Sequence, residues 1–154
     1  MRLKALTRQI QDVNATFALP EASRGLYASA GGLARLVRCV GLPVASEIAL
    51  TGRILTADDA KGLGLVNVVA GQPGAKSVVE AAVEMAGRIA ALSPDAVIIT
   101  RAGLRMALEE GSVETATQRT EERYGIAMRQ AENFGIGLEA FAKREKPKWV
   151  PSKL

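Results

Sequence analysis

The side chains available for acid–base chemistry are defined first by what the sequence lacks. Its 154 residues include no histidine and a single cysteine, Cys39. The lack of histidine excludes Ser-His-Asp and Cys-His catalysis and histidine-containing zinc sites, and we predict no metal site. Proton transfer must therefore rest on carboxylates, lysine, tyrosine or Cys39. The lone cysteine also excludes an internal disulfide and fits a reducing, intracellular compartment.

One carboxylate, Glu21, ends a short extended segment, residues 17–21. Pro20 favours this conformation because a proline biases the residue before it, here Leu19, away from the helical region. The glycines that follow indicate a loop. Taken alone, Glu21 is best interpreted as a surface glutamate at the end of a strand.

Short helices and one short strand are predicted to follow this loop. Gly41 is expected to end the first helix and Pro43 to lie in the first turn of the second. Thr56 is the expected N-cap of the third helix, with acids in its first turn. The predicted elements are helices at 33–40, 43–50 and 57–63 and a β-branched strand at 65–69.

The remainder of the chain is predicted to be helical up to its last residues. Ser93-Pro94-Asp95 supplies an N-cap, a first-turn proline and an acid, and Gly135-Ile136-Gly137 is expected to interrupt the last helical stretch. Helix 112–134 carries only a thin stripe of small apolar residues, so we expect a partner subunit or domain to cover it. Beyond Pro147 the tail is basic and expected to be extended. The predicted helices are 76–92, 93–110, 112–134 and 138–144.

The overall composition fits one ordinary folded domain. Hydrophobic residues make up 48% of the chain and charged residues 23%, which argues against wholesale disorder. No apolar run approaches the roughly 20 residues that span a bilayer, and the first 13 residues do not form a secretory signal. The net charge of +4 is mild and allows an anionic partner.

An ordered series of residues runs through the predicted elements. It comprises Phe17-Ala18-Leu19-Pro20-Glu21, Arg24-Gly25-Leu26, Ala30-Gly31-Gly32-Leu33, Leu50-Thr51-Gly52-Arg53, Gly64-Leu65-Val66-Asn67 and Ala140-Phe141-Ala142-Lys143-Arg144. In this order and spacing, from Asn14 to Trp149, the series resembles the C-terminal part of the enoyl-CoA hydratase/isomerase (crotonase) family, and in particular its peroxisomal hydratases.

The resemblance implies an α/β crotonase-like spiral fold, here as a mostly helical C-terminal fragment with short strands. It divides the chain into an atypical N-terminal segment (1–13), the C-terminal part of the crotonase core (14–74), a helical trimerisation region (75–146) and a tail (147–154). It also implies a homotrimer or a hexamer built from two trimers.

The resemblance further implies hydration of a 2-enoyl-CoA. This reaction needs a base for the water, an acid for the α-carbon and donors for the thioester oxygen. Similar enzymes use two glutamates, and Glu21 matches the second, so we expect it to be catalytic. Leu19, Pro20 and Ser29 are expected to bind substrate, Ser29 standing where many hydratases have a glycine whose backbone helps to hold the water. Dienoyl isomerases have an aspartate at that position, so their activity is disfavoured, whereas Δ3,Δ2-enoyl isomerase activity stays open.

Three residues near the end of the last helix match the family's CoA-binding region: Phe141, Lys143 and Arg144. A cation near phosphates and an apolar ring near adenine make physical sense. A solvated basic helix end is an equal alternative, and the family's usual acid-Lys-Arg order is altered. No separate cofactor is expected, because coenzyme A is part of the acyl-CoA thioester substrate.

By the same resemblance, the part of the fold before Asn14 holds the first glutamate and both oxyanion amides. Residues 1–13 do not resemble the strand expected there. The chain is therefore either a truncated relative or the product of an incomplete gene model, and we favour the second.

The sequence ends Ser152-Lys153-Leu154, the tripeptide that a peroxisomal import receptor reads. We therefore expect peroxisomal localisation. Two further functional classes stay open beside catalysis. The chain could be a non-catalytic assembly partner of the family, or it could bind nucleic acid, which is disfavoured because only six aromatic residues occur and the basic residues are dispersed.

Overall fold

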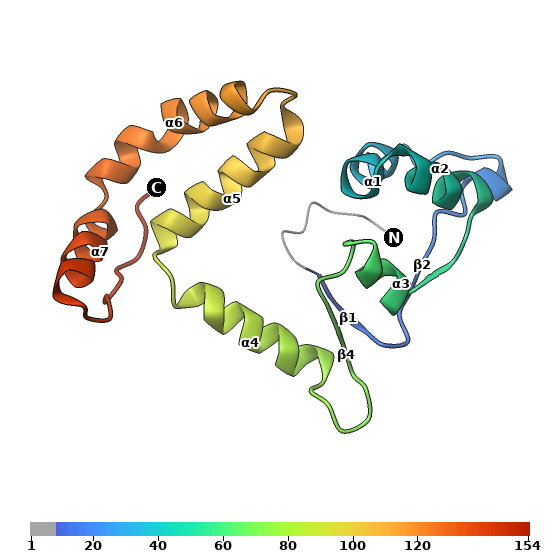
Figure 1. Ribbon diagram of the computed structural model, residues 1–154, viewed down its shortest axis with the longest axis horizontal. Helices are drawn as coiled ribbons and strands as arrows, with labels where there is room; N and C mark the ends of the chain where they lie inside the picture. The colour runs from blue at the N-terminus through green and yellow to red at the C-terminus, as the bar shows by residue number, and fades with distance from the viewer. Residues whose placement is uncertain (1–8) are drawn as a thin grey trace. The chain divides into compact units, whose positions relative to one another are not determined.

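The computed structural model describes residues 9–154, and the chain divides between Glu84 and Met85 into two compact units. Figure 1 follows the chain through both. The first unit contains two small sheets with short helices between their strands. The second is helical and ends in an extended tail.

Each sheet of the first unit has two strands. β1 (Ile10–Asp12) pairs in parallel with β4 (Val68–Ala70), with Ile10 opposite Val68. β2 (Thr16–Phe17) pairs antiparallel with β3 (Leu55–Thr56), with Phe17 opposite Leu55. A parallel pair requires a long crossover connection, and here that crossover carries the helices of the unit. The strand at Ile10–Asp12 corrects the expectation that residues 1–13 contain no strand of the family's kind; residues 1–8 lie outside the described part of the chain.

The helices of the first unit begin and end where local signals direct. α1 (Gly32–Val40) ends at Gly41 and α2 (Leu42–Thr51) has Pro43 in its first turn, as expected. α3 (Ala57–Gly62) begins with a capping box. The amide of Asp59 donates to Oγ1 of Thr56 (3.1 Å), and the amide of Thr56 donates to Oδ2 of Asp59 (2.9 Å). The bounds are η1 (Ala22–Arg24), α1 (Gly32–Val40), α2 (Leu42–Thr51) and α3 (Ala57–Gly62).

The core of the first unit lies between these helices and the β2–β3 pair. Leu55, 1% exposed, lies at its centre, and Phe17 and Leu19 enter it from β2 and the segment that follows. Burying side chains of this size contributes roughly 1.5–3 kcal/mol each. The segment that leads to Glu21 is therefore anchored by its own apolar residues. The remaining buried members are Leu36, Ala45, Ile48, Ala60 and Val66.

The second unit is built on a pair of helices, α5 (Pro94–Glu109) and α6 (Val113–Gln130). Gly103 lies at their contact, where a Cβ would be 3.4 Å from Cγ2 of Thr120, so the two helices approach closely. Ser93 and Ser112 cap the two helices by accepting from the amides three residues on. The helices are α4 (Val78–Ala90), which spans the boundary between the units, α5 (Pro94–Glu109), α6 (Val113–Gln130) and α7 (Glu132–Lys143).

The end of α6 differs from the sequence prediction. The predicted break at Gly135-Ile136-Gly137 is wrong, because α7 runs straight through both glycines. The chain instead breaks at Ala131, which has extended backbone (φ −69°, ψ 139°). Burial of Asn133 directly after the break explains the difference, since it aligns α7 to place this side chain inside the unit.

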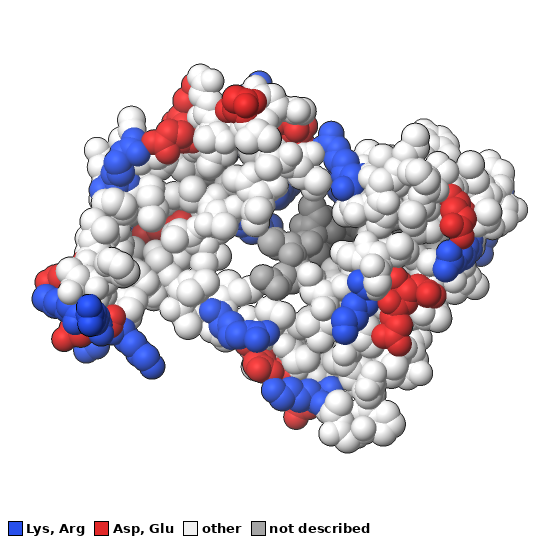
Figure 2. Space-filling view, viewed as in Figure 1, with Lys and Arg blue, Asp and Glu red and all other residues white. Residues whose placement is uncertain are grey.

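The surface charges are mixed in sign. On the face shown in Figure 2, Lys and Arg lie intermixed with Asp and Glu and form no single basic surface. Across residues 9–154, no helix is both long enough and apolar enough to cross a membrane.

Candidate active site

The backbone of Glu21 is held by the turn that follows it. Glu21 lies directly before η1 with φ −58° and ψ −42°. Its carbonyl accepts hydrogen bonds from the amides of Arg24 and Leu26, both at 2.9 Å, and the Ser23 hydroxyl donates to the carbonyl of Pro20 (2.7 Å). These three bonds fix the direction in which the Glu21 side chain leaves the chain.

The Glu21 side chain is half-buried, and one of its two carboxylate oxygens is in an unusual environment. Oε2 is fully buried, and no group within residues 9–154 donates a hydrogen bond to it. More than nine in ten buried polar groups have a partner, so an unused buried acceptor requires an explanation. A carboxylate that exchanges a proton with a bound reactant is one such explanation.

The end of α2 supports the Leu19–Glu21 segment from behind. Gly52 follows α2 with a left-handed backbone (φ 67°), and a Cβ on it would lie 3.9 Å from the Leu19 carbonyl oxygen and from Cα of Pro20. Glycine adopts φ values in this range without strain, whereas other residues do so rarely. Arg53 pairs with Glu47 at 2.7 Å and closes the same turn. Gly52 was part of the family series, but its contact with Leu19 and Pro20 appears only in the fold.

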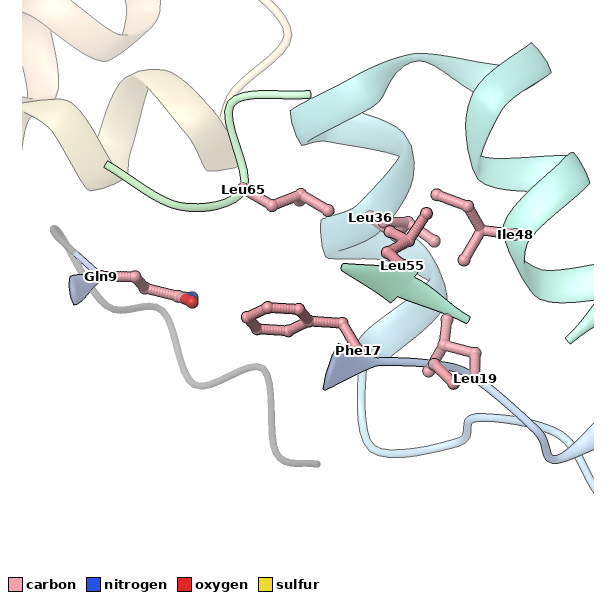
Figure 3. A pocket seen from close by; sticks show the side chains of 8 residues that line it. Gln9, Phe17, Leu19, Leu36, Ile48, Leu55 and Leu65 are labelled. Atoms are coloured by element: carbon pink, nitrogen blue, oxygen red, sulfur yellow. The ribbon is translucent and has the colours of Figure 1, made fainter. Parts of the chain in front are cut away.

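An apolar gap lies beside this segment, shown in Figure 3. Its internal space is about 20 Å³, enough for about one water molecule and far below the several hundred Å³ of a ligand pocket. Leu19 points into this gap and is buried in the core. The predicted contact of Leu19 with substrate therefore stays a prediction, and Pro20, half-buried beside Glu21, is the more accessible of the two. The gap is lined by Gln9, Phe17, Ala18, Leu19, Leu36, Ile48, Leu55 and Leu65.

Ser29 lies in the exposed loop before α1. Its amide donates to the Tyr27 carbonyl at 2.8 Å. That amide is thus already engaged, and holding a water there would require the loop to change. Its predicted role in substrate binding stays a prediction.

The residues predicted to bind CoA lie in the second unit. Phe141 is 86% exposed on α7. Lys143 forms an ion pair with Glu139 (2.5 Å), and this hydrogen bond lowers the pKa of the Glu139 carboxyl. Arg144 ends the helix in a left-handed conformation (φ 56°). An exposed ring and two exposed basic side chains on one helix end suit an anionic ligand and equally suit a solvated surface.

No candidate metal centre occurs in the part of the chain that the structure describes, where no three His, Cys, Asp or Glu side chains gather. Sequence reasoning missed one buried polar cluster. Asp95 and Asn133, each 2% exposed, are joined by a hydrogen bond of 2.7 Å from Nδ2 of Asn133 to Oδ2 of Asp95. Asp95 was assigned to a helix first turn, but no local signal indicates its burial.

Comparisons with known proteins address the whole chain. A family model described as enoyl-CoA hydratase/isomerase matches residues 8–152, so the match begins before Asn14. Mevalonyl-coenzyme A hydratases from Aspergillus fumigatus and Beauveria bassiana are 43% and 40% identical over 141 and 140 residues. These alignments cover 92% and 91% of this chain and 51% and 49% of the relatives. A carnitinyl-CoA dehydratase from Salmonella typhi is 32% identical, covering 88% of this chain and 52% of the relative.

Solved structures agree with this similarity. An enoyl-CoA hydratase from Mycobacterium tuberculosis superposes with a TM-score of 0.83 at 32% identity, and one from Mycobacterium marinum with 0.84 at 31%. Each match covers 96% of this chain and 57% of the solved chain. The chain spans about half the length of the curated relatives it matches. With its ordered residues, its fold and these matches in agreement, the chain belongs to the enoyl-CoA hydratase/isomerase family and has the family's crotonase fold over the part that it spans.

Proposed function

We propose that this chain is part of a hydratase that adds water to, or removes it from, the double bond of a 2-enoyl-CoA, with Glu21 as a proton-transfer group. The observation that carries the proposal is the buried Oε2 of Glu21, an acceptor without a partner among the described residues. It lies at the end of a segment anchored in the core and matches the second glutamate of the family.

The proposed chemistry uses Glu21 for one of two proton transfers. Hydration requires one proton to leave the attacking water and another to reach the α-carbon, while donors stabilise negative charge on the thioester oxygen. Glu21 can carry one of these protons. By family resemblance, the first glutamate and the oxyanion amides come from the part of the fold before Asn14. Turnover is therefore expected only when those groups are supplied.

The names of the relatives suggest which class of acyl group the substrate carries. The two fungal proteins at 43% and 40% identity are named mevalonyl-coenzyme A hydratases, and the bacterial protein at 32% is named a carnitinyl-CoA dehydratase. Both acyl groups are short and carry a polar or charged group in addition to the hydroxyl that dehydration removes. We propose a short acyl-CoA with such a further polar group, for example mevalonyl-CoA, as the substrate, in preference to an unbranched fatty acyl-CoA.

A chimera tests the function. The portion of the Aspergillus fumigatus relative that this chain does not span is joined to residues 9–154, and dehydration of mevalonyl-CoA and hydration of crotonyl-CoA are measured. Glu21→Gln keeps size and removes the acid, so we expect a loss of kcat of about 10²-fold or more. Glu122→Gln, on the exposed face of α6, is the matched control. Equal activity of Glu21→Gln and the control would refute the role of Glu21.

Two alternatives from the sequence have distinct outcomes in this assay. A Δ3,Δ2-enoyl isomerase needs fewer acids than a hydratase, and a single carboxylate with a free acceptor suits it; it would convert a 3-enoyl-CoA faster than it hydrates crotonyl-CoA. A non-catalytic assembly partner would leave the chimera folded and inactive on all three substrates.

We also propose that the protein is directed to peroxisomes by Ser152-Lys153-Leu154 and that its import receptor is a partner. A fluorescent protein carrying residues 149–154 tests this proposal, and diffuse cytosolic fluorescence would end it. A homotrimer or hexamer is likewise proposed. Large exposed apolar side chains on the second unit support it, and light scattering on the chimera measures it. These side chains include Leu104, Val113, Ile126 and Leu138.

A further inference from the structure

The tail of the chain is bound to the second unit at two adjacent residues. After α7 the chain turns back and runs beside it (Figure 1). The indole Nε1 of Trp149 donates to the carbonyl of Ala91 (3.1 Å). Its ring lies over Gly137, where a Cβ would be only 3.3 Å from Cη2. The absence of a side chain at Gly137 thus makes room for the indole.

The next residue, Val150, is held by a side-chain amide in the manner of a β-bridge. Its amide donates to Oδ1 of Asn133 (2.9 Å), and Nδ2 of Asn133 donates to its carbonyl (2.9 Å). The second Nδ2 hydrogen goes to Oδ2 of Asp95 (2.7 Å). Because Asp95 can only accept when ionised, it fixes which way the Asn133 amide faces. The pair is therefore oriented to bind an extended backbone.

The last residues then line a recess of about 340 Å³ at the start of α7. Leu154 lies along it and is 44% exposed, so more than half of its surface is covered. Nζ of Lys153 is 3.7 Å from Oε2 of Glu132, and this pair is solvated and weak. The recess is lined by Asp95, Ala127, Gln130, Ala131, Glu132, Asn133, Pro151, Lys153 and Leu154.

We infer that the second unit, through the Asn133 amide and the site of the Trp149 indole, binds the chain's own tail, which forms one wall of this recess, and so competes with the import receptor for the tail. The inference rests on the proposed targeting role of Ser152-Lys153-Leu154. A receptor that reads a C-terminal peptide contacts its backbone, side chains and carboxylate together. Only four residues follow Val150, which reach about 14 Å when fully extended. While Asn133 is hydrogen-bonded to Val150, residues 151–154 cannot extend far enough from the second unit to be enclosed by another protein.

The expected effect follows from the docked fraction. A receptor that binds only the released tail has its apparent affinity reduced by the fraction of chains in which the tail is free. The two Asn133–Val150 bonds and the half-buried indole of Trp149 together favour docking. We expect the tail of the folded chain to bind about tenfold or more weakly than the same tail as a free peptide.

The test uses a substitution in the tail, so the folded unit is left intact. Val150→Pro removes the N–H that Asn133 accepts and leaves the terminal tripeptide unchanged. Lys148→Pro is the matched control, because the Lys148 amide donates no hydrogen bond within residues 9–154. Fluorescence anisotropy measures binding of the purified peptide-reading domain of the receptor to each 154-residue chain and to each matching 146–154 peptide. Trp149, the only tryptophan, reports release of the tail through a red shift of its emission.

Three outcomes are distinguishable. Sequestration predicts that the peptides bind the receptor tightly and that the wild-type and Lys148→Pro chains bind it about tenfold or more weakly. The Val150→Pro chain should bind with an affinity within about twofold of that of its peptide, and its tryptophan emission should be red-shifted. A wild-type chain that binds as tightly as its peptide would overturn the sequestration and leave the targeting proposal standing. Peptides that do not bind the receptor would overturn the targeting proposal and the competition with it.

Discussion

The Asp95–Asn133 pair makes the most specific prediction about stability. Both residues are 2% exposed, and the bond from Asn133 is the one hydrogen bond that the structure records for the Asp95 carboxylate. Its other oxygen, Oδ1, is buried without a partner among the described residues. Replacing Asn133 by leucine keeps a side chain of similar size and leaves this carboxylate without a hydrogen-bond partner among the described residues.

The magnitude follows from the bonds that are lost. Asn133→Leu removes three hydrogen bonds, each worth about 1 kcal/mol, and leaves a buried carboxylate unpaired at a further cost of about 1–3 kcal/mol. We expect the free energy of unfolding to fall by about 4–6 kcal/mol. Adding Asp95→Leu removes the unpaired charge, so the double variant should be about 1–3 kcal/mol more stable than Asn133→Leu alone.

Urea unfolding followed by circular dichroism measures these differences in the full chain. Gln130→Leu, an exposed amide on the rim of the same recess, is the control and should change the stability by no more than about 0.5 kcal/mol. A cost below about 1 kcal/mol for Asn133→Leu, or single costs that simply add in the double variant, would refute a buried, coupled pair.

Two further predictions concern α7 and α3. Gly135→Ala should stabilise α7 by up to about 1 kcal/mol, because the new Cβ meets open space. Gly137→Ala should increase the stability less, or decrease it, because its Cβ meets the Trp149 ring. Thermal unfolding compares the stability of the two variants. The backbone amide of Thr56, and then its hydroxyl, lower the pKa of Asp59. The stabilisation from Asp59 is therefore present above its pKa in the unfolded chain and is lost as the pH falls through its lower pKa in the folded chain. In Asp59→Asn the free energy of unfolding should consequently decrease less steeply below about pH 4 than in the wild type. Unfolding measured over a series of acidic pH values tests this.

Local elements could be predicted because their signals are local. Thr56 with Asp59, Pro43 and Gly41 act on neighbouring backbone groups within one turn of helix, and the structure confirms the helices that they begin or end. The ordered series of residues that resembles the family could likewise be recognised from the sequence, because it depends only on the order and spacing of residues. Family membership and the crotonase fold follow from it, and the comparisons agree.

Contacts between distant residues could not be predicted in this way. The Gly135-Ile136-Gly137 break was wrong because helix propensity is a weak preference that tertiary contacts overrule. Here those contacts are Asn133 with Asp95, 38 residues away, and Trp149 with Ala91, 58 residues away. Ser29 was expected to bind substrate, and only the loop conformation shows that its amide already donates a hydrogen bond to the Tyr27 carbonyl.

The sequence by itself determined which family this chain belongs to and where most helices begin, because these properties reside in residue identity and spacing. On the same basis it predicts, without a test so far, that Glu21 matches that family's catalytic glutamate. Tertiary structure alone decided that Oε2 of Glu21 is buried with no partner among residues 9–154, that Leu19 packs into the core and that the tail is held at Val150. Burial and hydrogen bonding of a side chain depend on what the rest of the chain brings against it, and for Asn133 and Val150 that partner lies 17 residues away.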